Sequence, residues 1–162
     1  MIKKVAILAN GGDVAGFNAV IRGIVKTAEN NDVECYGFID GYNGLLKNEY
    51  VKLSTAEEGN AEGILPKGGS IIGSSTNANV FNYKVVKEDG TVEYQDLSDK
   101  CVQNIKNDGF DCVFTLGGDG TQKSARDFSL KGVNVIGVPK TIDNDVACTD
   151  ITFGYNTAVT VA

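Results

Sequence analysis

Residues 111–138 of this 162-residue chain, DCVFTLGGDGTQKSARDFSLKGVNVIGV, contain the clearest folding signal in the sequence. The apolar run 111–116 predicts a buried strand, the glycine-rich run 117–121 a turn, and residues 122–130 a helix. A second strand is expected at residues 133–138, ending at Pro139. A strand, a helix and another strand in this order indicate two parallel strands joined by a right-handed crossover.

The N-terminal part repeats this arrangement. Residues 4–9 form a continuous apolar run, as in a strand buried on both faces of a parallel sheet. A turn at residues 10–13 and a second strand at 33–39 enclose a segment with apolar residues at helical spacing. These apolar residues are Phe17, Val20, Ile21, Ile24, Val25 and Ala28. We therefore predict an α/β fold with a mainly parallel sheet flanked by helices.

The middle of the chain is less regular. Asp40 to Gly44 is expected to form a turn, and residues 83–94 alternate around Asp89-Gly90, which predicts a β-hairpin. A helix is expected from about residue 96 to residue 109, with Asp96 or Ser98 as its cap. The final residues, 155–162, start an apolar segment without a terminal cap, which predicts a truncated chain.

Composition excludes several functions. The chain has 15 basic and 21 acidic residues, a net charge of −6, and no cluster of Lys or Arg, which argues against nucleic acid or an anionic membrane as the main partner. No apolar run is long enough to cross a membrane. The apolar run after Met1 is short and reaches Gly11 quickly, so no secretory signal is expected and the protein is assigned to the cytoplasm.

The absence of histidine excludes a Cys/His zinc site and a nucleophile activated by histidine. No two of the cysteines stand in a CxxC pair, so all of them are expected to be reduced, buried thiols: Cys35, Cys101, Cys112 and Cys148.

Three polar turns each follow a predicted strand, and the carboxyl ends of parallel strands form the ligand-binding edge of such sheets. Gly11-Gly12-Asp13 suits phosphate binding at a helix N-terminus, although a tight turn that requires positive φ explains it equally well. Residues 117–121 suit a phosphate cradle in which Asp119 holds Mg²⁺, or a simple turn with Thr121 as helix cap.

The third turn, PKTIDND at residues 139–145, places a cation and a hydroxyl beside two carboxylates. Phosphoryl transfer to an alcohol requires such groups: a base, a carboxylate linked to the metal, and cations for the phosphoryl oxygens. The alternative is an acidic loop that is merely solvated. We expect all three turns to meet in one cleft.

These motifs together resemble the phosphofructokinase family. The similarity is carried by GGDVAGFNAVIRG at 11–23, GGSIIGS at 68–74, GGDGT at 117–121 and PKTIDND at 139–145, and it continues through Thr149-Asp150 and Phe153-Gly154. The resemblance covers residues 1–162 as the donor-binding, N-terminal portion of a chain about twice as long. It implies a Rossmann-like fold of the phosphofructokinase type, in which the hairpin at 83–94 is an insertion.

The resemblance implies Mg²⁺-dependent transfer of the γ-phosphoryl group of ATP to the 1-hydroxyl of fructose 6-phosphate, a step of glycolysis. By position, Asp143 is the base that takes the hydroxyl proton. Thr141 and Asp145 help to hold the sugar, the transferring phosphate or the metal. Because the second half is missing, the 162-residue chain alone is expected to be inactive.

The family also implies the residues of the donor site. Asp119 binds Mg²⁺, Tyr42 lies near the nucleotide base, and four residues line the donor phosphates: Gly12, Gly118, Gly120 and Thr121. Arg22 and Lys26 match positions that bind an allosteric effector in bacterial members. A homo-oligomer, either a tetramer or a dimer, is expected.

Two departures from the family bear on the reaction. Thr76 stands where members usually have an arginine that reaches the transferring phosphates, so donor binding or rate is expected to be weaker. Gly120 accompanies ATP use in the family whereas Lys140 accompanies pyrophosphate use. We expect ATP, because Gly120 leaves room for its α-phosphate; the alternative is pyrophosphate.

Two further alternatives remain at this level. GGDGT alone also occurs in NAD kinases and diacylglycerol kinases, although TIDND at residues 141–145 argues against them. A non-catalytic, nucleotide-binding paralogue is the other alternative, suggested by Thr76 and the short chain.

Overall fold

A computed structural model describes residues 1–76 and 79–162. Within these ranges the strands form a six-stranded sheet in the order β3-β2-β1-β6-β7-β8 and a separate two-stranded sheet of β4 and β5. Every neighbouring pair in the large sheet is parallel except β2 with β3. Its strands are β1 Lys4–Ala9, β2 Glu34–Phe38, β3 Tyr50–Leu53, β6 Cys112–Gly117, β7 Val135–Thr141 and β8 Phe153–Gly154. The predicted α/β class is confirmed.

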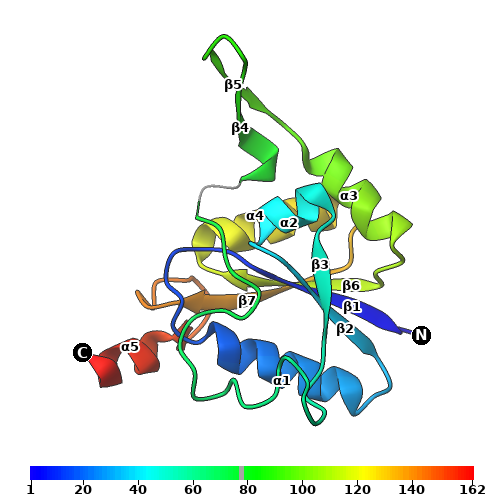
Figure 1. Ribbon diagram of the computed structural model, residues 1–162. Coiled ribbons are helices and arrows are strands. Elements are labelled where there is room, and N and C mark those ends of the chain that lie inside the picture. Colours follow the sequence, from blue (N-terminus) through cyan, green and yellow to red (C-terminus); the bar gives the residue numbers. More distant parts are fainter. Residues whose placement is uncertain (77–78) are drawn as a thin grey trace.

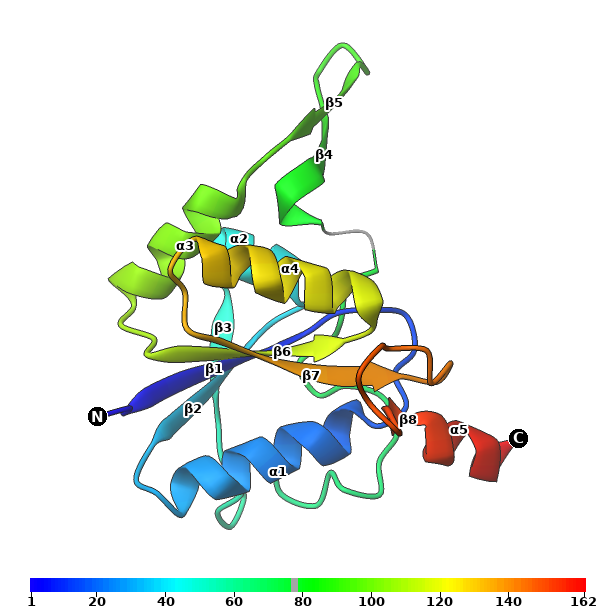
Figure 2. The same cartoon turned by 180° about the vertical axis from the view of Figure 1, so that it is seen from behind.

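Helices cover the two faces of this sheet (Figures 1 and 2). Helix α1 (Phe17–Glu29) lies on one face, and three helices lie on the other: α2 (Tyr42–Lys47), α3 (Ser98–Asn107) and α4 (Asp119–Leu130). A short 3-10 turn, η1 (Val80–Asn82), precedes the hairpin, and α5 (Tyr155–Val161) ends the chain.

The sequence of β1 explains the two hydrophobic cores. Successive side chains of a strand point to opposite faces, so an apolar run supplies both faces at once. Val5 and Ile7 pack in the core beneath α1, whereas Ala6 and Leu8 pack in the core shared with α2, α3 and α4. In a sheet with one exposed face, every second side chain of this apolar run would face solvent. The continuous run thus places β1 at the centre of the molecule.

The order of the strands creates a switch point between β1 and β6. From β1 the chain proceeds to β2 and β3 on one side, whereas from β6 it proceeds to β7 and β8 on the other. Right-handed crossovers in opposite directions place α1 and α4 on opposite faces. The loops after β1 and β6 therefore diverge and leave a crevice at their carboxyl ends, where ligands of such sheets bind.

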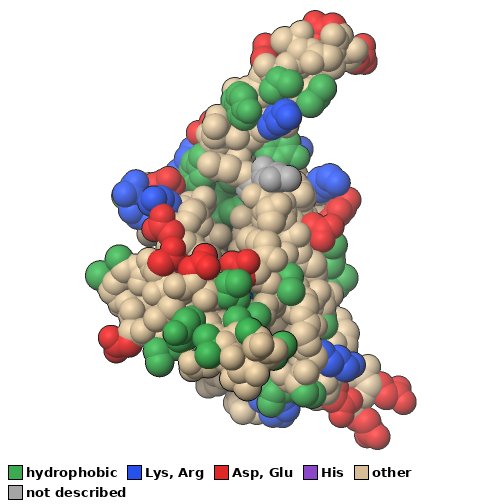
Figure 3. Space-filling view, turned by 90° about the vertical axis from the view of Figure 1, so that its left-hand side faces the viewer, with side chains coloured by type: hydrophobic (Ala, Val, Ile, Leu, Met, Phe, Trp, Pro, Cys, Tyr) green, Lys and Arg blue, Asp and Glu red, His purple; other side chains and the backbone are tan. Residues whose placement is uncertain are grey.

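The predicted hairpin is confirmed as β4 (Tyr83–Val86) and β5 (Val92–Gln95), which pair antiparallel. It stands away from the body of the molecule, and its tip carries acidic side chains (Figure 3). Its base is held by η1, where the Phe81 ring packs 4.9 Å from the ring of Phe128 in α4.

Several expected bounds were wrong. Helix α4 begins at Asp119 rather than 122, so most of the glycine-rich turn is its first turn. Strand β7 continues through Pro139 to Thr141, because Lys140 and Thr141 pair with β8. The segment expected as a turn at residues 40–44 leads into α2, which begins at Tyr42.

Two smaller expectations also need correction. Leu97, rather than Asp96 or Ser98, occupies the N-cap position of α3. Asp96 lies one residue before the N-cap and accepts hydrogen bonds from the backbone N–H and the hydroxyl of Ser98. Three of the cysteines are buried as expected, but Cys148 is exposed on the loop after β7. Burial raises the pKa of the Cys35 and Cys101 thiols to about 12, which keeps them protonated.

We predict that Gly16→Ala destabilises the fold. Gly16 caps α1 with a φ of 86°, and a Cβ there would lie 2.7 Å from the backbone nitrogen of Gly154. Gly63→Ala is the matched control, because Gly63 also has positive φ but a Cβ there would meet no atom within 4 Å. Urea unfolding should show a loss of about 1 kcal/mol for Gly63→Ala and about 3 kcal/mol for Gly16→Ala. Equal losses would contradict the close approach.

Candidate active site

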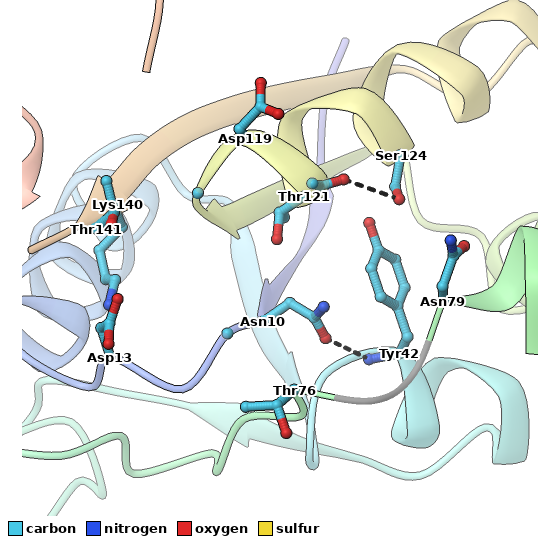
Figure 4. A pocket seen from close by; sticks show the side chains of 13 residues that line it. Asn10, Asp13, Tyr42, Thr76, Asn79, Asp119, Thr121, Ser124, Lys140 and Thr141 are labelled. Carbon is cyan, nitrogen blue, oxygen red and sulfur yellow. Dashed lines mark hydrogen bonds between the residues drawn. The ribbon is translucent and has the colours of Figure 1, made fainter. Parts of the chain in front are cut away.

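A cavity of about 330 Å³ lies at the switch point between β1 and β6 (Figure 4). Residues from all three predicted turns line it, which confirms that these turns meet. The lining residues are Asn10, Gly11, Asp13, Tyr42, Thr76, Asn79, Gly118, Asp119, Gly120, Thr121, Ser124, Lys140 and Thr141.

The N-terminus of α4 forms one wall of the cavity. Gly118 is the N-cap and provides no side chain to cap the helix, so the first N–H groups of α4 have no intrahelical partner. Gly118 and Gly120 leave this backbone uncovered: a Cβ at Gly118 would meet only Thr141 at 3.7 Å, and one at Gly120 no atom within 4 Å. Such an uncovered helix N-terminus suits phosphate oxygens.

The loop after β1 forms a second wall, tied to the segment that ends at Thr76. Asn10 forms an isolated bridge with Ser75, the backbone N–H of Gly11 donates to the Ser75 carbonyl at 2.9 Å, and the Ser74 hydroxyl donates to the Gly11 carbonyl at 2.9 Å. Gly12, predicted to line the donor phosphates, is not among the lining residues, but a Cβ there would lie 3.1 Å from the Thr76 methyl group.

Tyr42 closes the inner end of the cavity beside Ser124 (Figure 4). It is buried, and its ring stacks on Phe128 at 6.0 Å. Within the described part of the chain its hydroxyl has no hydrogen-bond partner, and burial raises the pKa of that hydroxyl. Tyr42 therefore contributes an aromatic ring at the inner end of the cavity, the kind of group that packs against a nucleotide base.

Among the described residues, Lys140 is the only lysine or arginine that lines this cavity. It is 2% exposed, and in residues 1–76 and 79–162 its Nζ has no hydrogen-bond partner. Nζ lies over the ring of Phe17, 4.1 Å from the centroid. Burial lowers the pKa of Lys140 to about 8, although the negative charges of Asp13 and Asp143 raise it.

The TIDND segment contributes Thr141 to the cavity but not its two carboxylates. The Asp143 backbone N–H donates to the Thr141 hydroxyl at 3.2 Å, and Thr152 donates to the Thr141 carbonyl at 2.8 Å. Asp143 and Asp145 are exposed on the loop beyond β7, outside the lining residues. Asp143 nonetheless lies close enough to Lys140 to influence its pKa.

Asp119 is the carboxylate of the glycine-rich run 117–121 that reaches the cavity. It lines the cavity in the first turn of α4, and one carboxylate oxygen pairs with Lys123 at 2.7 Å on the solvent side. Among the described residues no cluster of three or more acidic, Cys or His side chains could hold a metal alone. A single carboxylate beside a phosphate site nevertheless fits Mg²⁺, which in phosphoryl-transfer sites takes most of its ligands from phosphates and water.

Arg22 and Lys26 lie outside the cavity, on α1. They are one turn apart, with Lys26 in the last turn of the helix, at the end far from the cavity. Their predicted role in effector binding stays a prediction.

Three lining residues were not selected from the sequence: Asn10, Asn79 and Ser124. Asn10 directly follows β1, so the rule that placed Gly11 at the site could have included it. Ser124 lies one turn after Gly120, to whose carbonyl its hydroxyl donates at 3.2 Å. Asn79 approaches from the segment before the hairpin, and no local pattern indicates it.

We expect Lys140→Met to stabilise the fold while weakening the site. A pKa lowered from 10.5 to about 8 means that the unfolded chain binds more protons between these values, so wild-type stability rises with pH across that window. At pH 7 the variant avoids burying a charge and should gain about 2 kcal/mol in urea unfolding, whereas above pH 10.5 the gain should vanish. Binding of an anionic ligand in this cavity, measured with pyrophosphate as the probe, should weaken about tenfold.

Lys106→Met, an exposed substitution on α3, is the control for Lys140→Met and should change neither quantity. A Lys140→Met variant that is less stable than the parent at pH 7 would contradict the buried, unpaired ammonium.

Comparison with known proteins identifies the family. The sequence profile of the family described as phosphofructokinase matches residues 4–162. The chain belongs to the phosphofructokinase family. It is 52% identical over 162 residues to the ATP-dependent 6-phosphofructokinase 2 of Clostridium perfringens, and 41% identical over 160 residues to the ATP-dependent 6-phosphofructokinase 3 of Bacteroides thetaiotaomicron.

These alignments cover 99% and 98% of this chain but only 43% and 45% of the two relatives. The chain thus spans less than half the length of the curated phosphofructokinases that it matches.

Solved structures confirm the fold. The phosphofructokinase of Pichia pastoris in the T-state superimposes with a TM-score of 0.80 at 26% identity, covering 98% of this chain and 17% of that one. The pyrophosphate-dependent phosphofructokinase of Marinobacter aquaeolei superimposes with a TM-score of 0.73 at 24% identity, covering 95% of this chain and 37% of that one. The predicted phosphofructokinase type of α/β fold is therefore confirmed.

None of the helices in the described ranges is long and apolar enough to cross a membrane.

Proposed function

We propose that the protein containing this chain transfers the γ-phosphoryl group of ATP to the 1-hydroxyl of fructose 6-phosphate. One observation carries the proposal: a cavity at the switch point joins the uncovered N-terminus of α4, the cation Lys140 and the start of the TIDND segment. The two relatives described above are both named ATP-dependent 6-phosphofructokinases, which supports this substrate pair.

The donor phosphates are assigned to the wall made by Gly118, Gly120 and Thr121, where N–H groups and the positive end of the α4 dipole attract anions. Lys140 follows Pro139, the β7 residue paired with Gly117, and neutralises charge on the phosphate chain beside this wall. Tyr42, at the inner end, is assigned to the nucleotide base.

Asp143 is assigned as the base that accepts the proton of the sugar hydroxyl. Its backbone is fixed by the hydrogen bond to the Thr141 hydroxyl, and its carboxylate faces solvent, from where the acceptor sugar would arrive. Thr141 is assigned to the transferring phosphate, and Asp145 to the sugar side of the same loop. A base within reach of an alcohol typically contributes about 10²–10⁴-fold to the rate of proton transfer.

Asp119 is assigned as the protein ligand of Mg²⁺. The Asp119 carboxylate lies at the surface of the cavity, paired with Lys123, and both side chains are more than half exposed. Such an exposed ion pair is weak, so Mg²⁺ can readily displace the Lys123 ammonium from the carboxylate. When bound, the metal neutralises charge on the phosphate oxygens during transfer.

Pyrophosphate is the second candidate donor, and Lys140 favours it. A pyrophosphate group is small and highly charged, so a buried cation contributes more of its binding energy than it does for a nucleotide. Gly120 favours ATP, because open space at this position admits an additional phosphate.

We also propose that the protein acts in the cytoplasm as a homo-oligomer, a tetramer or dimer, and that Arg22 and Lys26 contribute to an effector site. Arg22 and Lys26 lie one turn apart on α1, which suits two contacts to a single anion.

The test is the initial rate of fructose 6-phosphate phosphorylation by the intact gene product, with Mg-ATP and Mg-pyrophosphate assayed side by side. A rate with ATP alone supports the proposal, and a rate with pyrophosphate alone replaces the donor. No rate with either donor would favour a non-catalytic paralogue in which Thr76 marks a lost activity. If Thr76→Arg then restores turnover, the missing guanidinium is the cause.

A further inference from the structure

Lys140 occupies an unusual position for a cation at a phosphate site. Its side chain is 2% exposed and its Nζ has no hydrogen-bond partner within the described residues. Asp13 lies on the same side of the cavity (Figure 4), yet no ion pair joins the two. An ammonium group without a partner is costly to bury, so another group must attract it.

The ring of Phe17 supplies that attraction. Nζ lies over the ring, 4.1 Å from the centroid, well inside the range of cation–π contacts. Phe17 is fully buried as the first residue of α1, and Gly16 at the N-cap fixes the backbone that enters the helix. The ring therefore has a fixed position, between the core beneath α1 and the cavity.

The Phe17 ring differs from a carboxylate at the same place in leaving the Lys140 N–H groups free. It stabilises the charged form of Lys140 without accepting a hydrogen bond, so the ammonium keeps its N–H groups for an incoming anion. A carboxylate would use those donors and would repel a phosphate. Both charged groups that influence Lys140, namely Asp13 and Asp143, raise its pKa, while burial lowers it.

We propose that Phe17 is a positioning residue of the donor site, whose ring face holds the Lys140 ammonium at the cavity wall ready for the phosphates of the donor. This inference rests on the proposed function for the identity of the donor. The alternative is that Phe17 only fills volume in the core. A test must therefore change the electrostatics of the ring while keeping its shape.

Stepwise fluorination makes that change. In the intact gene product, Phe17 is replaced by 4-fluoro-, 3,5-difluoro- and 3,4,5-trifluorophenylalanine, and the Kd values of Mg-ATP and of pyrophosphate are measured by titration calorimetry. Each fluorine withdraws electron density from the ring face, so both Kd values should rise progressively, by about tenfold for the trifluoro ring. The unfolding midpoint is measured for every variant.

Two controls separate this effect from packing. The same rings placed at Phe38, which is buried against Tyr50 and Phe110, should leave both Kd values unchanged. In a Lys140→Met background, fluorination of Phe17 should also have no effect, because the cation is absent. A flat series with Lys140 present, or an equal rise with Met at 140, would overturn the positioning role.

The outcomes also distinguish this inference from the proposed function. If the unsubstituted protein binds a donor but phosphorylates no sugar, the proposed reaction fails while the fluorine series still reports on Phe17. If the protein phosphorylates fructose 6-phosphate and the series is flat, the reaction stands and the role of Phe17 is refuted. Failure of the unsubstituted protein to bind either donor overturns both.

Discussion

Asp143→Asn in the intact gene product should lower kcat for fructose 6-phosphate about 10³-fold, with KM values for sugar and donor changed less than about threefold. The amide keeps the size of the carboxylate and leaves untouched the backbone N–H that donates to Thr141, so the loop should stay in place. Only the capacity to accept a proton is lost. Steady-state kinetics with both substrates varied measures the two constants separately.

Asp150→Asn is the matched control for this loss, since Asp150 is an exposed carboxylate on the same loop and outside the cavity. It should retain activity within about twofold of the parent. A loss of the same size in both variants would indicate that the net charge of the loop matters rather than a specific base. Full activity of Asp143→Asn, together with a large loss in Asp145→Asn, would transfer the role to Asp145.

The sequence predicts best those parts of the fold that local periodicity specifies. The apolar runs of β1 and β6 are buried on both faces, and the alternation at residues 83–94 forms the hairpin. Antiparallel β3 has only four residues, and its pairing with β2 depends on neighbours in space. The extension of β7 across Pro139 depends in the same way on β8.

The candidate site was predictable where a motif follows a strand, and it was not where the chain returns from a distance. Gly118, Gly120 and Thr121 fall at the carboxyl end of β6 as expected. Lys140 is buried against Phe17, which lies 123 positions away in the sequence (140 − 17). No local sequence pattern predicts this contact. The sequence identified Lys140 as a cation for phosphate, but its environment required the structure.

Gly120→Asp should abolish most use of ATP, raising its KM about a hundredfold, while the KM for pyrophosphate changes much less. A Cβ at Gly120 would meet no atom within 4 Å, so the substitution should not disturb α4. Asp119 already provides one negative charge in this first turn, and a second carboxylate at the cavity wall would repel an additional phosphate. Coupled assays with each donor measure the change.

Gly120→Ala separates charge from bulk in this experiment. Because the space beyond Gly120 is open, a methyl group alone should raise the KM for ATP by less than about fivefold. Similar losses in the Ala and Asp variants would mean that any side chain blocks the donor, so that size rather than charge excludes the α-phosphate. If Gly120→Asp instead leaves ATP use intact, the donor phosphates do not pass along the N-terminus of α4, and Lys140 would then have to act on a donor bound at another wall of the cavity.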